Sequence, residues 1–243
     1  MRALSGSKLL DVWERGQAAP PIERALYLLS SAIPESSPEA LALLSIGQRD
    51  AQIFELRELA FGRQLPMMTM CPACFQTLEL TVPTSSLRVP MKPLDDLECC
   101  LHLDGYAIRI RPLNSEDIVS CAGMDAARYR RELLTGCVTE ASFQGDVLSA
   151  QTLPESVLRE IEERIADIDP QADVHINLVC PECNNTWKQA FDIVSYFWME
   201  IDAWARRILL EVSVLARVFG WRESDILELS PARRQIYMAM AQA

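Results

Sequence analysis

The chain has 243 residues, so it can bury a substantial hydrophobic core in one large domain or in two smaller ones. Its hydrophobic content of 49% and charged fraction of 23% are typical of globular proteins, and no apolar run reaches the ~20 residues of a membrane-spanning helix. The formal net charge of −11, from 34 acidic and 23 basic side chains, argues against nucleic-acid binding, because an acidic surface repels phosphate.

The first part of the chain, residues 1–70, is predicted to form a helical N-terminal region. A short helix is expected at residues 9–14. A second helix begins at Pro21, because proline suits the first helical position, and it stops at Pro34. A short segment follows at residues 38–44.

A longer helix is expected after residues 45–50 and is predicted to end at Gly62, because glycine suits the C-terminal cap of a helix. Ile53, Leu56 and Ala60 recur at helical spacing and are expected on its buried face. The charged side chains of this helix are expected to face water or a partner; they are Arg49, Asp50, Glu55, Arg57 and Glu58.

Two motifs with the pattern C-P-x-C organise the rest of the chain, Cys71-Pro72-Ala73-Cys74 and Cys180-Pro181-Glu182-Cys183. Within each motif, two thiols lie three residues apart across a tight turn, so both can reach one tetrahedral zinc ion. Two such pairs supply four thiolates and close the metal to water and substrate, as in structural zinc sites. We therefore predict one structural Zn²⁺ held by Cys71, Cys74, Cys180 and Cys183. The alternative is a disulfide or free-thiol arrangement.

Each motif adjoins a segment in which polar and apolar residues alternate, as they do in strands: residues 77–82 follow the first motif and residues 174–179 precede the second. A redox C-x-x-C pair instead opens a helix in a βα context. We therefore interpret residues 71–83 and 174–190 as two halves of one zinc ribbon, separated by an inserted α/β segment at 84–173. Such an insert is unusual, because a compact ribbon has about 15–20 residues between its pairs.

The cysteine content and the N-terminal sequence favour a cytoplasmic protein. There are eight cysteines, and residues 1–7 lack the apolar core of a signal peptide. In a reducing cytoplasm, paired thiols are more often metal ligands than disulfides. The adjacent Cys99 and Cys100 point to opposite faces of a strand and make a poor chelating pair, while Cys121 and Cys137 are expected to be small buried apolar residues.

The insert is expected to contain a hairpin followed by helices. Strands that alternate at 97–103 and 106–111 flank Asp104-Gly105, which is a signal for a type I′ turn. Helices are predicted in the remainder, one capped by Asn114 or Ser115 and two at about 124–135 and 155–166.

The C-terminal region, residues 191–243, is predicted to be helical. Its longest helix is expected at 193–219, because large apolar side chains recur there every three or four residues. Short helices are expected at 225–229 and from Pro231. The whole chain is therefore expected to have a mostly helical α+β fold: a four-cysteine zinc ribbon, a long inserted hairpin-plus-helices segment and a helical C-terminus.

The motifs of common enzymes are missing from the sequence. The two histidines lie in no recognisable nucleophile or H-E-x-x-H context, and the nine glycines form no phosphate-binding loop. We therefore expect a protein that is not an enzyme.

Several segments, together with both C-P-x-C motifs, are similar to those of a known family: Trp13-Glu14-Arg15-Gly16, Glu23-Arg24-Ala25-Leu26, Ile46-Gly47-Gln48-Arg49-Asp50 with Phe61-Gly62, Phe219-Gly220-Trp221-Arg222-Glu223, and Ile226-Leu227-Glu228-Leu229-Ser230-Pro231-Ala232-Arg233-Arg234 with Tyr237. On these segments, the chain resembles the baseplate hub assembly chaperone family of T-even phages, in the form associated with extracellular contractile injection systems. The resemblance extends over nearly the whole chain.

The resemblance implies a cytoplasmic factor that helps to assemble the hub or tail of a phage-tail-like particle without catalysis. Its expected partners are baseplate hub, spike or tape-measure-type proteins, with no membrane partner. One alternative is a stoichiometric structural component of the baseplate. The other is a zinc-ribbon regulator that binds nucleic acid, which the charge disfavours because basic patches are short, as at Arg206-Arg207 and Arg233-Arg234.

Overall fold

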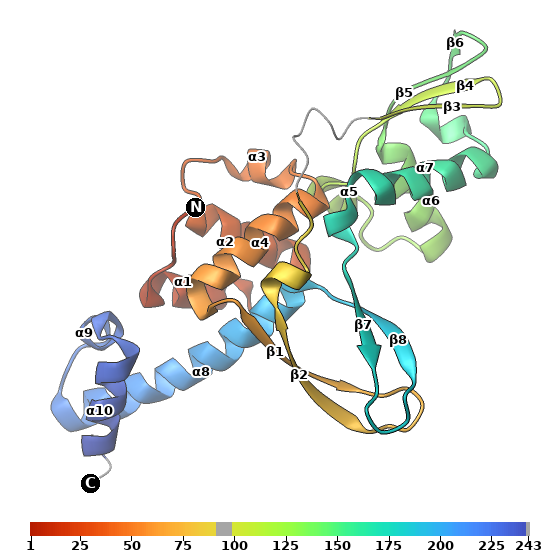
Figure 1. Cartoon of the computed structure of the whole chain (residues 1–243). Coiled ribbons are helices and arrows are strands. Elements are labelled where there is room, and N and C mark those ends of the chain that lie inside the picture. The colour runs from red at the N-terminus through yellow and green to blue at the C-terminus, as the bar shows by residue number, and fades with distance from the viewer. Residues whose placement is uncertain (91–98, 242–243) are drawn as a thin grey trace. The chain divides into compact units, whose positions relative to one another are not determined.

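The computed structural model describes residues 1–90 and 99–241 and divides the chain into two compact units (Figure 1). The first unit joins Met1–Glu35 to the chain from Ile193 onward, and the second is formed by Ser36–Asp192. Helices predominate in the described residues, and a four-cysteine cluster and a long C-terminal helix are present, so the predicted mostly helical α+β fold is confirmed. None of the described helices combines the length and the hydropathy that a membrane crossing requires.

The first unit is built around one long helix. In chain order its elements are α1 (Gly6–Gly16), α2 (Pro21–Ala32), α8 (Ile193–Phe219), α9 (Glu223–Glu228) and α10 (Pro231–Ala241). The bounds of α8 match the predicted helix, and its apolar stripe is buried at Phe197, Ile201 and Ile208. This helix packs against α1 and α2 and, at its other end, against α9 and α10.

The junction between α1 and α2 is held by Arg24. Its side chain donates hydrogen bonds to the carbonyl oxygens of Gly16 (2.9 Å) and Gln17 (3.0 Å), at the end of α1 where backbone acceptors have no helical partner. The Arg24 guanidinium also lies 4.6 Å from the ring centroid of Trp198 on α8. Because a Cβ atom at position 16 would lie 2.3 Å from that ring, glycine is needed at this contact.

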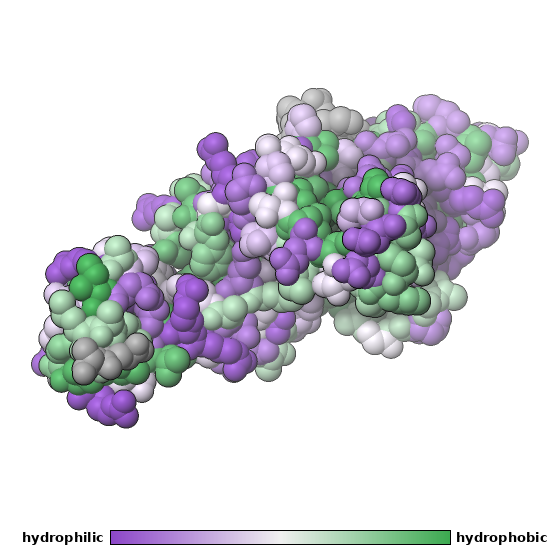
Figure 2. Space-filling view, turned by 60° about the horizontal axis from the view of Figure 1, so that its bottom comes forward, coloured by the Kyte–Doolittle hydropathy of each residue, from purple (hydrophilic) through white to green (hydrophobic). Residues whose placement is uncertain are grey.

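At the C-terminal end of this unit, α10 is tied to α8 by a buried ion pair and an aromatic cluster. Arg234 Nε lies 3.0 Å from Glu211 Oε2. The rings of Phe219, Trp221 and Tyr237 lie with their centroids 4.8–6.0 Å apart. Apolar side chains also remain exposed here, and Figure 2 shows green surface over the end that carries α10; the exposed residues include Val218, Ile236 and Met240.

The second unit combines helices with three antiparallel sheets. In chain order its elements are α3 (Pro38–Ala42), α4 (Ile46–Phe61), β1 (Gln64–Met70), β2 (Thr77–Pro83), η1 (Thr84–Ser86), β3 (Cys99–Leu103), β4 (Tyr106–Ile110), α5 (Ser115–Ser120), α6 (Ala126–Gly136), β5 (Val138–Phe143), β6 (Asp146–Val147), η3 (Ala150–Thr152), α7 (Glu155–Ile168), η4 (Pro170–Ala172), β7 (His175–Val179) and β8 (Thr186–Ala190).

Strand β1 corrects the expectation that residues up to 70 are helical. Its seven residues include three methionines and a proline and carry no strong preference for a strand. Pairing with β2 along its whole length nevertheless holds it extended. Tertiary pairing therefore overrides the local propensity of this segment.

The insert contains the predicted hairpin of β3 and β4. Asp104 (φ 49°) and Gly105 (φ 84°) both adopt positive φ, as a type I′ turn requires. Strands β5 and β6, which no sequence pattern predicts, extend the hairpin to a sheet with the order β3-β4-β5-β6. Ile108 and Ile110 of β4 share one core with Leu158 and Ile161 of α7. Leu97, predicted to begin the hairpin, lies outside the described residues.

Three charged residues of α4 that were expected to face water or a partner are buried. Arg49 is 4% exposed, Asp50 8% and Arg57 1%. Arg49 and Asp50 form an ion pair of 2.7 Å, and the Arg57 guanidinium donates a 2.7 Å hydrogen bond to the carbonyl oxygen of Gly62. Burial is tolerated because each charge has a partner. Glu55 is exposed, as expected, and Glu58 is half-buried.

Candidate metal centre

The four cysteines of the C-P-x-C motifs lie at the tips of two hairpins (Figure 1). Strand β1 pairs with β2 across the first motif, and β7 pairs with β8 across the second. Thr69 of β1 donates a 2.6 Å hydrogen bond from Oγ1 to Oε1 of Gln189 on β8, which joins the two hairpins. Segments that are far apart in sequence therefore form one ribbon.

The chain turns in the same way in both motifs. In the first, Cys71 N donates to the carbonyl oxygen of Gln76 (2.9 Å) and Phe75 N donates to that of Cys71 (3.0 Å). The matching bonds of the second motif are Cys180 N to Asn185 O and Asn184 N to Cys180 O, both 2.9 Å. This repeated turn directs both thiols of each motif to the same side.

The spacing of the four sulfur atoms fits a tetrahedral metal ion. Cys71 Sγ lies 3.6 Å from Cys183 Sγ, and Cys74 Sγ lies 3.6 Å from Cys180 Sγ. All four sulfurs lie within 4.8 Å of one another. A zinc ion with Zn–S bonds of ~2.3 Å requires S–S separations of ~3.8 Å around a tetrahedron. The structure thus brings the four predicted residues together in a cluster that can hold one metal ion.

The environment of Cys71 favours its thiolate form. Burial alone would raise the pKa of this thiol, but the backbone N–H groups of Cys74 and Ala73 and the neighbouring thiols lower its pKa to about 6. Cys74 shifts the other way: although the Gln76 backbone N–H opposes it, burial and the neighbouring thiols raise the pKa of Cys74 to about 12. A thiolate, not a thiol, is the form that binds zinc. Cys71 and Cys180 are buried, whereas Cys74 and Cys183 are exposed, so two edges of the cluster face solvent.

The other cysteines lie away from this cluster. Cys99 is half-buried, with its Sγ 3.1 Å from Arg164 Nε, and Cys100 is exposed. Cys121 and Cys137 are buried as expected, and burial raises the pKa of Cys137 to about 12.

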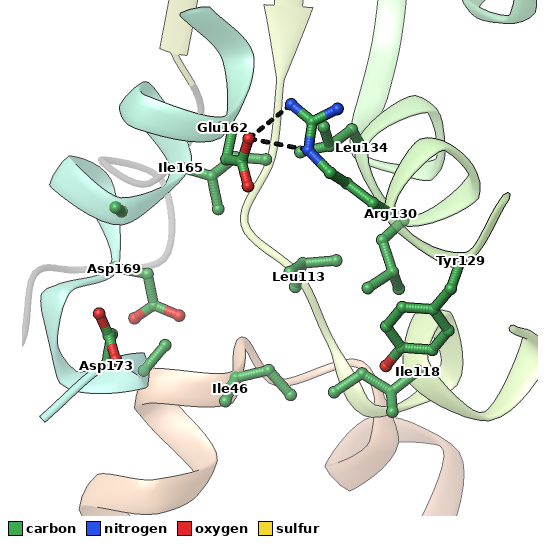
Figure 3. Close-up of a pocket in the computed structure, with 13 residues that line it drawn as sticks. Ile46, Leu113, Ile118, Tyr129, Arg130, Leu134, Glu162, Ile165, Asp169 and Asp173 are labelled. Atoms are coloured by element: carbon green, nitrogen blue, oxygen red, sulfur yellow. Dashed lines mark hydrogen bonds and ion pairs between the residues drawn. The ribbon is translucent and has the colours of Figure 1, made fainter. Parts of the chain in front are cut away.

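A pocket of ≈ 560 Å³ in the second unit was not anticipated from the sequence. Its lining comes from α4, α5, α6, α7 and η4 and is mostly apolar. Figure 3 shows the Arg130–Glu162 pair at one end, Tyr129 on one side and Asp169 on the other. Arg130 lies 2.6 Å from a carboxylate oxygen of Glu162 and 2.6 Å from one of Glu155, so its charge is already matched.

Asp169 connects this pocket to the first turn of α4. Gly47 N donates a 2.8 Å hydrogen bond to Asp169 Oδ2, and a Cβ atom at position 47 would lie 2.0 Å from Oδ1. A carboxylate is favoured at a helix N-terminus, where unpaired N–H groups and the helix dipole carry positive charge. The segment at 46–50, singled out by its similarity to a known family, therefore docks α4 against the insert.

Comparison with models of protein families gives a match to the family described as T4 bacteriophage base plate protein, over residues 22–198. The matched range is well over half of the chain and contains the whole second unit, with both ribbon hairpins, as well as α2 from its second residue and the start of α8. Comparisons with curated proteins and with solved structures give no match.

Proposed function

The chain belongs to the T4 bacteriophage base plate protein family, and on this basis we propose that it is a non-enzymatic assembly chaperone for the baseplate hub or tail of a contractile, phage-tail-like injection particle. The family match over residues 22–198 is the observation that carries the proposal. Similarity of the flanking segments, from Trp13-Glu14-Arg15-Gly16 to the C-terminal helices, supports the chaperone role and the form associated with extracellular injection systems.

The proposed partners are hub, spike or tape-measure-type proteins of the same particle, met in the cytoplasm before assembly is complete. The net charge of −11 supports this role. A large net charge keeps an unassembled protein soluble and steers it towards partners of opposite charge. The proposal contains no catalytic step.

The proposal includes one structural Zn²⁺ bound by Cys71, Cys74, Cys180 and Cys183. The metal would cross-link the tips of two hairpins that the hydrogen bond between Thr69 and Gln189 also joins. It would thereby hold together the two ends of the long segment between Cys74 and Cys180. Without the metal, packing alone would have to order this segment. Its role in this proposal is to shape a surface, not to react.

The second candidate is a stoichiometric component of the finished baseplate. The description of the matched family, a base plate protein, favours it directly. A nucleic-acid-binding regulator remains the weaker third hypothesis, because the acidic charge opposes phosphate.

Deletion of the gene in the native host tests whether the chain acts in assembly at all. We expect the deletion strain to make the particle proteins but no complete contractile particles in electron micrographs, because the baseplate cannot form. A plasmid copy of the gene should restore the particles. Normal particles in the deletion strain would contradict both the chaperone and the structural role.

A further inference from the structure

The two metal-binding turns are internal repeats that differ at one telling position. Residues 71–78 and 180–187 can be superposed one for one in sequence, and both place a residue with φ 58° directly after the second cysteine. In the second turn this residue is Asn184, a type that is enriched in the left-handed region. In the first turn it is Phe75. A bulky side chain there is an outlier, because its Cβ atom crowds the backbone.

Folding does not account for Phe75. Its side chain is 69% exposed, so the unfavourable backbone conformation is not offset by burial of the ring. Among the described non-glycine residues with positive φ, the others are polar: Asp104, Gln144 and Asn184. A residue that is strained and also leaves a large apolar group in water points to a role in binding.

Two further exposed apolar side chains, both methionines, lie on β1 of the same hairpin. Met68 is 70% exposed and Met70 57%, and they alternate with the less exposed Met67 and Thr69. The residues at the equivalent places in the second hairpin are Asn177 and Val179. The first hairpin thus carries three exposed, large apolar side chains where the second carries one. We name Met68, Met70 and Phe75 the knuckle patch.

The charges around the knuckle patch indicate the chemistry of what it meets. Glu79, the cross-strand neighbour of Met68, and Glu182 in the second turn are both exposed. The two hairpins contain one lysine, Lys188, one histidine, His175, and no arginine. Four thiolates around one Zn²⁺ would add a net charge of about −2. An apolar patch with an acidic surround is complementary to an apolar surface flanked by lysine or arginine.

We propose that the knuckle patch is the surface that docks a baseplate partner, and that the partner presents an apolar segment flanked by basic side chains. Phe75 is the anchor, and the flexible methionines adapt to the partner around it. This inference rests on the proposed function and assigns it to one place in the molecule. The strained turn is retained because the ring is needed at the tip, not because the fold requires it.

The test replaces Phe75 by the residue that the second turn uses. Phe75→Asn should leave the zinc content unchanged and the melting temperature equal to or above that of the unchanged protein, because asparagine suits φ 58°. The wild-type chain is first tested for binding to the purified hub, spike and tape-measure proteins. The affinity of Phe75→Asn for the protein that the wild-type chain binds should fall at least about tenfold, as for an interface hot spot. Complementation of the deletion strain should fail correspondingly.

The second hairpin supplies the matched control. Val179→Ser removes the exposed apolar residue equivalent to Met70 and should bind and complement normally. If Phe75→Asn fails to fold, the double variant M68Q/M70Q takes its place, with the same loss of binding expected.

Unchanged binding by Phe75→Asn, or an equal loss in Val179→Ser, would overturn the docking surface and leave the assembly role intact. If none of the three baseplate proteins binds the wild-type chain, the docking surface fails. If deletion also has no effect on particles, the proposed function fails with it.

Discussion

At the scale of single residues, a missing side chain can be as decisive as a charged one. Position 16 lies against the Trp198 ring, which in turn lies beneath the Arg24 guanidinium. We expect Gly16→Ala to destabilise the protein by about 1–3 kcal/mol, because the added methyl group must displace a packed ring. Urea denaturation followed by circular dichroism measures the change.

Gly6, in the first turn of the same helix, is the control for this prediction. Its nearest neighbours would lie 3.8 Å from an added Cβ atom, which is ordinary contact. Gly6→Ala should therefore be neutral or stabilising by up to about 1 kcal/mol, as alanine generally is in helices. Equal effects of the two substitutions would contradict the packing described here.

The buried carboxyl of Asp50 should make stability depend on pH. Burial raises the pKa of Asp50 to about 6, although Arg49 opposes this shift, whereas the ordinary value is 3.8. Between these values the folded state holds a proton that the unfolded state has lost, so this group's contribution to the free energy of unfolding decreases as pH rises from about 4 to about 6. The decrease is on the order of 2–3 kcal/mol.

The measurement is the difference in free energy of unfolding between the unchanged protein and Asp50→Asn at several pH values. As the pH rises through this window, the free energy of unfolding of the wild-type protein should fall relative to that of Asp50→Asn. Above the window the difference between the two proteins should no longer change with pH. Glu55→Gln, at an exposed site on the same helix, is the matched control. A flat difference for Asp50→Asn would show that the carboxyl titrates normally.

The features that depend on a local sequence pattern could be predicted from the sequence. Those that depend on which parts of the chain surround a residue in the folded protein could not. The spacing of thiols within each C-P-x-C motif is local, and it identified the cysteines that the structure brings together. The burial of Arg49, Asp50 and Arg57 was not predicted, because a charged helical face looks the same in sequence whether solvent or protein surrounds it. The pocket beside Asp169 depends on five separate elements and has no signature of its own.

At the scale of elements, the ribbon is where the metal prediction is tested. The protein purified under reducing conditions should contain one zinc per chain by atomic emission. Cys180→Ser should lose most of this zinc, increase hydrogen exchange in β7 and β8, and lower solubility, because three thiolates no longer close the site. The loss of stability should be smaller than the ~10 kcal/mol typical of isolated zinc fingers, since the second unit has a separate core.

Cys100→Ser is the control for this variant, because Cys100 is an exposed cysteine outside the cluster. It should keep its zinc. Absence of zinc from the wild-type protein, when it is produced with zinc available, would contradict the metal prediction.

The predicted element boundaries were accurate where an apolar periodicity runs over many residues. They were wrong where a segment becomes a strand only by pairing with a distant one. The helix at 193–219 was predicted to its ends because its apolar stripe runs through seven turns' worth of chain without interruption and Gly220 stops it. Strand β5 was missed because Val138–Phe143 becomes a strand only by pairing with β4, across α5 and α6. Strand β6 is two residues long and has no pattern to detect.

At the scale of the whole molecule, the size and polarity of the binding surface distinguish a chaperone from a permanent subunit. A chaperone must bind its client and then leave, so its interface should be modest and partly polar. The knuckle patch, three apolar side chains with exposed acids beside them, has that character. A permanent baseplate subunit would instead be held by a larger and more apolar interface.

The most direct test of the central claim is the copy number of this chain in finished particles. Quantitative mass spectrometry should find it in immature complexes from the native host, together with a hub, spike or tape-measure-type protein. It should be absent from contractile particles purified in high salt, because a chaperone departs before the particle is complete. Its presence there at a fixed copy number, resistant to salt, would contradict the chaperone role and make it a structural component.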